Sequence, residues 1–146
     1  MKRIKKIVLF IAALLLTIPS NAAEEVADSD NVTEDFNWDP VISAIIQVES
    51  GGNTKAKRGN SVGAMQITPI LVAECNQILR QRKSKKRFRL SDRFSLQKSK
   101  EMFLLFQSKY NPLNSIEKAI RSWNGGINYG IRQTQRYYEK VMKALQ

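Results

Sequence analysis

Carboxyl groups are scarce in the basic part of this 146-residue chain, and one of them has an unusual position. The later glutamates fall on the polar faces expected of surface helices, and Asp92 lies near an expected helix start, where a carboxylate suits the helix dipole. Glu49 instead ends a strongly apolar segment, directly before Ser50 and two glycines. The carboxyl groups after residue 40 belong to Glu49, Glu74, Asp92, Glu101, Glu117 and Glu139.

The place of Glu49 suits a general acid. Burial against apolar groups disfavours the ionised carboxylate and raises its pKa. Such a group can hold a proton near neutral pH and deliver it to a leaving oxygen. The alternative is an ordinary glutamate at a helix end that points to water, and composition alone leaves both interpretations open.

A helix must carry Glu49 to its place. Asp39 and Pro40 are typical of an N-cap followed by proline in the first turn, and Gly51-Gly52 is typical of a helix end. Between them the apolar residues have helical spacing and predict a helix to about Glu49. These residues are Val41, Ile42, Ile45, Ile46 and Val48.

Four further helices are expected after a polar loop at residues 53–62. No convincing strand alternation is present, so we expect at most a short hairpin in that loop. The sequence predicts a mainly α fold in a single compact domain without internal repeats. The helix start and stop signals are Thr68-Pro69, Ser91 or Ser95, Asn111-Pro112, Asn114 with Glu117, and Asn124-Gly125-Gly126.

The first residues predict export. Residues 2–6 are rich in Lys and Arg, residues 7–18 carry no charge, and Pro19 precedes the small residues Ser20 and Ala22. This order is typical of a secretory signal peptide, residues 1–22, cleaved after Ala22. A membrane anchor is the alternative, but the apolar segment is shorter than the roughly 20 residues needed to span a bilayer.

Residues 23–38 form an acidic segment that is expected to be a disordered leader or linker. The domain then occupies residues 39–146. The chain has a net charge of +11, so the domain is strongly basic. Outside the cytosol, cell-wall polymers and lipid head groups are more suitable anionic partners than nucleic acid. A nucleic-acid binder is the interpretation that retention in the cytoplasm would favour.

Metal and cofactor chemistry are not expected. The chain has no histidine, and the lone Cys75 can form neither an internal disulfide nor a metal site by itself. The glycine pairs are better interpreted as turns than as a phosphate-binding loop. We therefore predict no metal, no cofactor and a monomer.

Four short motifs follow one another along the chain: Glu49-Ser50-Gly51-Gly52-Asn53, residues 63–69 (GAMQITP), residues 119–126 (AIRSWNGG) and residues 137–141 (YYEKV). In this order they resemble the soluble lytic transglycosylase (SLT) domain of the lysozyme-like superfamily. The resemblance covers about residues 41–145. It implies a lysozyme-like fold with a long substrate groove, and a reaction that cleaves the β-1,4 bond between N-acetylmuramic acid and N-acetylglucosamine in peptidoglycan. It also implies that Glu49 is the catalytic acid.

The resemblance also assigns substrate-binding positions. Ser50 would fix the turn after the acid, and Gln66 would bind an acetamido group. Met65 belongs at the groove wall, with core packing as the alternative. Ser61 is the nearest candidate for a serine that helps bind the N-acetyl group in relatives.

Three aromatic residues and an asparagine complete the expected site. Trp123 replaces a tyrosine found in many relatives, so it can stack on a sugar but lacks the phenol. Asn124 would position backbone or sugar, with a helix C-cap as the alternative. Tyr137 or Tyr138 would donate a hydrogen bond to Glu49, and we prefer Tyr137.

A mechanism with one acid is the economical interpretation. Most glycosidases use two carboxyl groups across the bond, and no acid occurs between Glu49 and Glu74. Glu49 would then act as acid and afterwards as base, which gives a 1,6-anhydro product without water. If Asp92 approached in space, a hydrolytic muramidase would result. A wall-binding or secretion-associated protein without activity is the third alternative.

The run from Arg80 to Arg89 is an apparent insertion rich in Lys and Arg. It is either a solvated connector or a surface that adheres to anionic wall polymers or membranes. Salt would weaken such adhesion, because exposed charges are screened within about 10 Å at 0.1 M.

Overall fold

The computed structural model describes residues 35–146. The predicted signal peptide, residues 1–22, lies outside the described residues, as does the leader as far as residue 34. At the start of the described part, Trp38 is buried and Phe36 packs partly buried against the core. Their rings lie 4.5 Å apart. The packed structure thus includes residues that the sequence analysis assigned to the leader.

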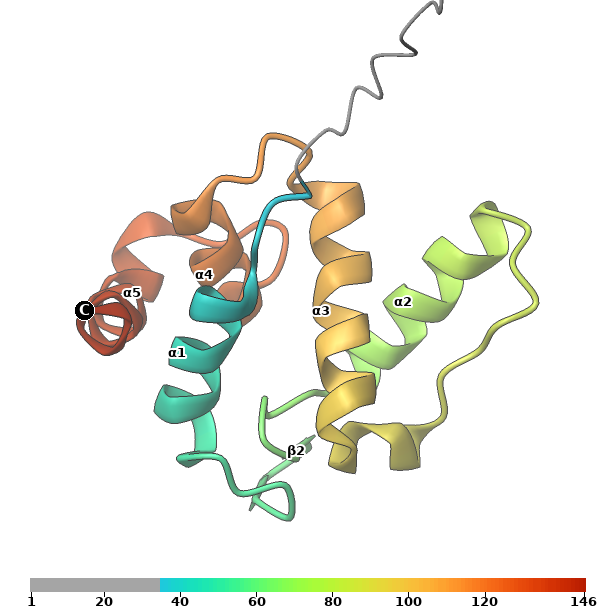
Figure 1. Ribbon diagram of the computed structural model, residues 1–146, viewed down its shortest axis with the longest axis horizontal. Coiled ribbons are helices and arrows are strands. Elements are labelled where there is room, and N and C mark those ends of the chain that lie inside the picture. Colours follow the sequence, from blue (N-terminus) through green and yellow to red (C-terminus); the bar gives the residue numbers. More distant parts are fainter. Residues whose placement is uncertain (1–34) are drawn as a thin grey trace, which may run out of the picture. The chain divides into compact units, whose positions relative to one another are not determined.

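The described part is mainly helical with one small hairpin, as predicted (Figure 1). Strands β1 and β2 pair antiparallel, with Lys57 opposite Val62 and Arg58 opposite Ser61. The elements are α1 (Asp39–Ser50), β1 (Lys57–Arg58), β2 (Ser61–Val62), α2 (Pro69–Gln81), the short 3₁₀ helix η1 (Leu90–Phe94), α3 (Leu96–Tyr110), α4 (Ile116–Gly125) and α5 (Ile131–Leu145).

The helices share one apolar core. Helix α1 packs on α4 and α5, and α2 packs on α3, which stands between α1 and α2 in Figure 1. Phe103 of α3 connects the α2–α3 pair to the group of α1, α4 and α5, because its ring lies 5.5 Å from Trp38 and 5.2 Å from Trp123. Burial of such large rings is a main source of folding free energy. The core thereby fixes α1 relative to α4 and α5, which carry the predicted site.

Local capping signals explain most helix limits. The Thr68 side chain accepts a hydrogen bond from the Leu71 amide, and Ser95, rather than Ser91, caps α3 through the Lys98 amide. Two predicted caps are wrong. Asp39 lies in the first turn of α1 after the N-cap residue Trp38, and Ser115, not Asn114, caps α4 by accepting from the Lys118 amide.

These two errors have local causes. Asn114 adopts a positive φ of 52°, a turn conformation that asparagine tolerates better than most residues. The neighbouring Ser115 is an equally good capping residue and takes the role. At α1, the N-cap lies one residue earlier than predicted, and the Asp39 amide donates to the side-chain oxygen of Asn37.

Gly63 is required by close packing. Its φ is +80°, and a Cβ atom there would lie 1.9 Å from the Arg93 carbonyl oxygen. No side chain fits this approach, so glycine lets the segment 63–67 pass directly over η1. The Arg93 side chain also donates to the carbonyl oxygens of Asn60 and Ile67. The hairpin and the 63–67 segment are therefore held against η1.

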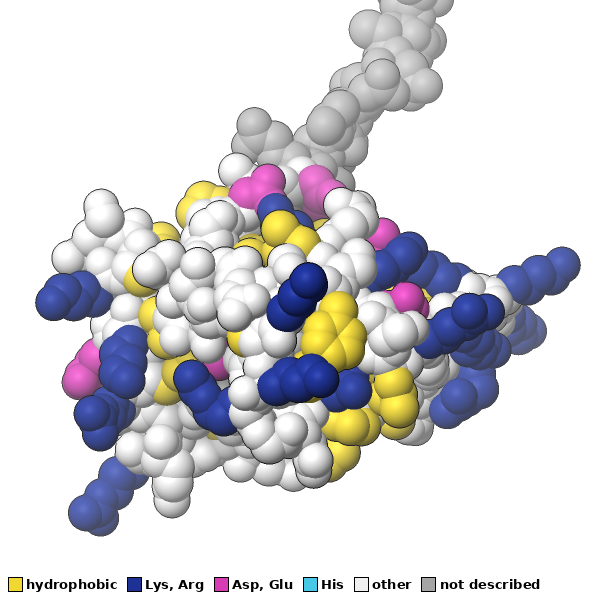
Figure 2. All heavy atoms as spheres, turned by 90° about the horizontal axis from the view of Figure 1, so that it is seen from below, with side chains coloured by type: hydrophobic (Ala, Val, Ile, Leu, Met, Phe, Trp, Pro, Cys, Tyr) yellow, Lys and Arg dark blue, Asp and Glu magenta, His cyan; other side chains and the backbone are white. Residues whose placement is uncertain are grey.

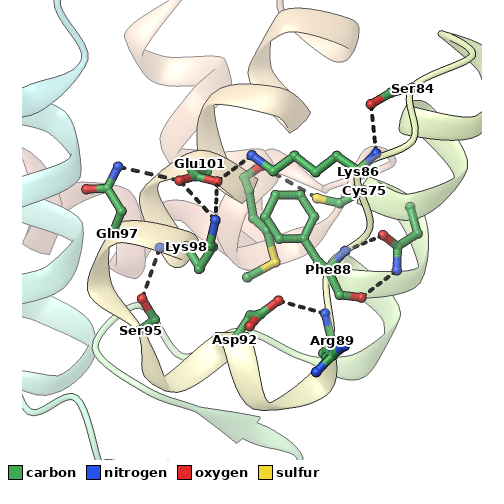
Figure 3. A network of polar contacts seen from close by, with 12 residues as sticks. Cys75, Ser84, Lys86, Phe88, Arg89, Asp92, Ser95, Gln97, Lys98 and Glu101 are labelled. Atoms are coloured by element: carbon green, nitrogen blue, oxygen red, sulfur yellow. Dashed lines mark hydrogen bonds and ion pairs between the residues drawn. The ribbon is translucent and has the colours of Figure 1, made fainter.

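The basic run Arg80–Arg89 begins in α2 and continues as an extended connection to η1. Asn76 holds it by two hydrogen bonds with the Phe88 backbone, of 2.8 and 2.9 Å, and the Phe88 ring is buried. Lys86 pairs with Glu101, which also pairs with Lys98 (Figure 3). Ordered apolar and polar anchors therefore hold this connection, while most of its cations point to solvent.

Candidate active site

Glu49 lies in the last turn of α1 and meets α5. The Tyr137 hydroxyl donates a hydrogen bond of 2.8 Å to Glu49 Oε1. Tyr138, the other predicted partner, instead lies under the Arg121 guanidinium, 4.3 Å from its ring centroid. The structure therefore places the preferred residue of the pair, Tyr137, at the carboxyl group.

Burial raises the pKa of Glu49 above the ordinary value of a glutamate. The hydrogen bond from Tyr137 and the positive charge of Arg58 lower that pKa, but they do not cancel the effect of burial. Burial and the neighbouring Glu49 also raise the pKa of Tyr137. The phenol therefore stays protonated and acts as a hydrogen-bond donor.

A pocket of about 400 Å³ surrounds Glu49. Helix α5 contributes Gln133, Arg136, Tyr137 and Lys140, whose spacing of three, four and seven places them on one helix face. Within the described residues, Glu49 is the one carboxyl group that lines this pocket. The remaining lining residues are Val48, Arg58 and Asn124.

The turn after Glu49 is fixed by Ser50. Its hydroxyl donates to the Ala64 carbonyl oxygen at 2.8 Å and accepts from the Gly52 amide at 3.2 Å. Gly51 ends the helix with φ of 62°. Ser50 thus ties the end of α1 to the 63–67 segment.

Met65 and Gln66 have different surroundings. The Met65 side chain has 0% exposure and lies in the core, so core packing describes its place and the predicted groove-wall contact is not available in this conformation. Gln66 has a positive φ of 50°, and its side-chain nitrogen donates to the Gly63 carbonyl oxygen. Its Oε1 atom is buried and has no hydrogen-bond partner within the described residues.

A second pocket, of about 420 Å³, adjoins the first at Asn124. Gln66, Trp123 and Asn124 line it together with apolar groups such as Leu71 and Ile127. Trp123 is held by a hydrogen bond from its indole nitrogen to the Met65 carbonyl oxygen, at 3.2 Å. The two pockets therefore meet at Asn124, with Glu49 in the first and Trp123 in the second.

The remaining candidate, Ser61, lies in β2 opposite Arg58. Among the described residues it lines neither of these two pockets. Arg58, its partner across the hairpin, lines the pocket of Glu49 instead.

The sequence analysis missed the cations of the first pocket. Arg58 was assigned to a polar loop, while Arg136 and Lys140 were given no role. The signal was present in the spacing of α5, since Arg136 and Lys140 flank Tyr137 on one helix face. This signal has meaning only once Tyr137 is chosen over Tyr138, because that choice decides which face of α5 meets Glu49.

Arg121 holds α4 against α5. The residue is 3% exposed, and its guanidinium donates to Glu117, to the Ile131 carbonyl oxygen and to the side chains of Thr134 and Gln135. The ring of Tyr138 covers its face. This network orients α5 and so directs Tyr137 toward Glu49.

The other acids of the domain have partners or structural places of their own. Glu74 accepts from Tyr110 and Lys109 and lines the second pocket, while Asp92 accepts from the Arg89 amide in the first turn of η1. Glu139 is exposed and accepts from Gln135. Asp92 does not line the Glu49 pocket within the part of the chain that is described.

The model of one protein family, the transglycosylase SLT domain, matches residues 30–146. The chain belongs to the transglycosylase SLT domain family. Membership indicates transglycosylase-type activity on peptidoglycan, and peptidoglycan as the substrate that an SLT domain binds. The helical structure with its small hairpin is compatible with the compact lysozyme-like fold of an SLT domain. No curated protein and no solved structure gave a match.

Within residues 35–146 of this SLT domain, no group of three or more His, Cys, Asp or Glu side chains is placed to hold a metal ion. None of the described helices is both long and apolar enough to cross a bilayer.

Proposed function

We propose that this SLT domain is a lytic transglycosylase that cleaves the β-1,4 bond between N-acetylmuramic acid and N-acetylglucosamine and leaves a 1,6-anhydro ring. One observation carries the proposal. Glu49 is the sole carboxyl group lining its pocket among the described residues, and its pKa is raised. A two-carboxyl mechanism would need a partner across the bond.

In the proposed reaction Glu49 first acts as an acid. It gives its proton to the glycosidic oxygen, and the bond between that oxygen and C1 of the muramic sugar breaks. The carbonyl oxygen of the substrate's own N-acetyl group stabilises the positive charge at C1, as in substrate-assisted glycosidases. No carboxylate nucleophile from the protein is required.

Glu49 then acts as a base. Its carboxylate removes the proton from the 6-hydroxyl of the same sugar while that oxygen bonds to C1 and displaces the N-acetyl oxygen. The ring closes, Glu49 regains its proton, and water is neither consumed nor released. The Tyr137 hydroxyl stabilises the ionised state between the two steps, because a hydrogen bond to a carboxylate favours its charge.

The two pockets that meet at Asn124 are proposed to hold the glycan strand. Trp123 presents a partly exposed indole for stacking against a sugar ring. The unpaired Oε1 of Gln66 is an acceptor for an acetamido N–H group, whose hydrogen bond would satisfy a buried polar atom.

Digestion of purified peptidoglycan tests the function, with mass spectrometry of the products. We expect anhydro ends from the wild type and at least about a 100-fold lower cleavage rate for Glu49→Gln, since a general acid contributes roughly 10²–10⁴-fold. Glu139→Gln, an exposed change on α5, is the control with an unchanged rate. Reducing ends would instead indicate a hydrolytic muramidase. Equal cleavage by Glu49→Gln would refute the central role of that residue.

Export and wall adhesion complete the proposal. Residues 1–22 are proposed to direct export and to be removed after Ala22, which the N-terminal sequence of the protein recovered from cell fractions would test. The Arg80–Arg89 run is proposed to adhere to anionic wall polymers. Figure 2 shows many more Lys and Arg than Asp and Glu side chains on one face of the described part, spread over both of its ends.

A further inference from the structure

Three cations surround the pocket of Glu49. Arg58 comes from β1, and Arg136 and Lys140 come from successive turns of α5. All three are exposed, and none of them makes an ion pair within 4.0 Å among residues 35–146. Other cations of the domain, such as Lys86 and Lys109, do have carboxylate partners. The pocket therefore gathers positive charge that the described structure leaves unneutralised.

This arrangement opposes the acid chemistry of Glu49. A positive charge beside a carboxyl group favours its ionised form, and Arg58 lowers the pKa that burial raises. One carboxylate that is already hydrogen-bonded to Tyr137 does not require three cations. Their placement is explained if a further anion enters the pocket and neutralises them.

The pocket has the chemistry to hold such an anion. Its lining is polar apart from Val48, and Gln133 and Asn124 add amide N–H donors to the three cations. Arg58 and Arg136 present planar guanidinium groups, which bind carboxylates through two parallel hydrogen bonds. The volume of about 400 Å³ is large enough for a sugar substituent in addition to Glu49.

We propose that Arg58, Arg136 and Lys140 form a carboxylate-binding site beside Glu49 that recognises the acidic substituent of the muramic sugar. The carboxylate belongs either to the lactyl ether of that sugar or to the peptide attached to it. The proposal rests on the proposed function, since it takes peptidoglycan as the ligand. The site selects muramic sugars over neutral N-acetylglucosamine polymers, and it places the selected sugar next to the acid.

Binding measurements with the full chain carrying Glu49→Gln test the site, because this protein does not consume its ligand. Three tetrasaccharides of equal length serve as probes. The first carries muramic sugars with peptides, the second carries free lactyl carboxylates after an amidase has removed the peptides, and the third is neutral tetra-N-acetylglucosamine. Calorimetry at low salt gives each dissociation constant.

We expect the neutral tetramer to bind on the order of tenfold more weakly than the preferred anionic probe. Arg136→Gln should weaken binding of that probe about threefold, and the double variant with Lys140→Gln about tenfold, since an exposed ion pair contributes only a few-fold to binding. Neither change should affect the neutral tetramer. High salt should remove most of the difference between the probes.

Arg132→Gln is the matched control. Arg132 is an exposed arginine one turn before Arg136 on the same helix, but it does not line the pocket within the described residues. Its loss changes the net charge equally and should leave all three constants unchanged. Preference for the peptide-bearing probe would identify the peptide as the source of the carboxylate, and tighter binding of the amidase-treated probe would identify the lactyl group.

Two results would refute the proposed carboxylate-binding site. One is an equal effect of Arg132→Gln and Arg136→Gln, which would mean general attraction by net charge. The other is an equal loss of neutral and anionic ligands, which would mean a structural defect. Failure of the wild type to cleave peptidoglycan would refute the proposed function separately, because the selectivity is measured with an inactive variant.

Discussion

The Tyr137 hydroxyl meets Glu49 Oε1 at 2.8 Å, although the two residues are 88 positions apart in the chain. Glu49 arrives at the end of α1 and Tyr137 on the face of α5 that packs on it. This contact joins the first and last helices of the domain at the proposed acid. It gives Glu49 one fixed donor, while burial raises its pKa.

Tyr137→Phe should slow cleavage and change its dependence on pH. The hydrogen bond lowers the pKa of Glu49, so its removal raises that pKa and keeps the acid protonated to higher pH. The alkaline limb of the pH–rate profile should therefore move to higher pH. The maximal rate should fall on the order of tenfold, because a hydrogen bond to a charged group is worth about 1.5–3 kcal/mol. Initial rates on peptidoglycan at a series of pH values measure both effects.

Tyr138→Phe is the control for that change, since the Tyr138 ring stacks on Arg121 and would be preserved. Its profile should match the wild type. A shift of the Tyr137→Phe limb to lower pH would contradict the assigned direction.

Glu49→Gln should stabilise the protein at neutral pH. The pKa of Glu49 is higher in the folded than in the unfolded protein. Its protonated form therefore contributes to the free energy of unfolding below the unfolded-state pKa of about 4.3, and this contribution is lost as the pH rises through the folded-state pKa. Above that folded-state pKa the protein must hold a partly buried carboxylate, and glutamine removes this penalty. At pH 7 the urea midpoint of Glu49→Gln should be higher than that of the wild type. The difference between the two midpoints should become smaller as the pH falls toward about 4.

Glu139→Gln is the control, because Glu139 is exposed. The difference between its urea midpoint and that of the wild type should not change with pH in this way. A lower midpoint of Glu49→Gln at pH 7 would mean that Tyr137 and Arg58 outweigh burial.

Arg121→Met should destabilise the domain by about 3 kcal/mol, since each buried acceptor left without its hydrogen bond costs roughly 1–3 kcal/mol. The change removes the hydrogen bonds that join α4 to Ile131, Thr134 and Gln135. Urea denaturation measures the free energy of unfolding. Glu117→Gln removes only the exposed end of the network and should cost less than about 1 kcal/mol. Similar losses for both variants would contradict the buried role of Arg121.

Replacement of the exposed cations Lys83, Lys85 and Arg89 by glutamine should weaken adhesion to intact cell walls. Each lost cation removes a screened attraction, so we expect an effect of about 2–5-fold for the triple variant at low salt and almost none above 0.5 M. Co-sedimentation with walls measures it. Cleavage of a soluble oligosaccharide is the control and should stay unchanged. Equal adhesion at low salt would show that the run is a solvated connector.

Cys75 should resist alkylation in the folded protein. The residue has 0% exposure, and burial raises the pKa of its thiol to about 12. The reactive thiolate is therefore almost absent at pH 8, and access requires opening of the α2–α3 interface. Labelling in water and in urea, followed by mass spectrometry, should show modification only with unfolding. Rapid labelling in water would indicate local opening of α2.

Short-range signals in the sequence predicted much of the fold. Gly51 ends α1, and Thr68 and Ser95 cap their helices, because these effects depend on a residue and its near neighbours. At the start of α4, two adjacent residues offered similar capping signals, and the prediction chose the wrong one. Ser115 rather than Asn114 caps α4, since Asn114 takes a left-handed turn that depends on the chain path.

By itself the sequence determined the helices, the small hairpin, the scarcity of acids and the motifs that indicate an SLT domain, because periodicity, capping and residue type are local properties. The tertiary structure decided that Met65 is a core residue, that Tyr137 and not Tyr138 reaches Glu49, and that Arg58 joins Arg136 and Lys140 at one pocket. These relationships depend on how α1, α5 and the hairpin pack. Packing brings together side chains that are distant in the chain, and the spacing of residues within one segment does not specify it.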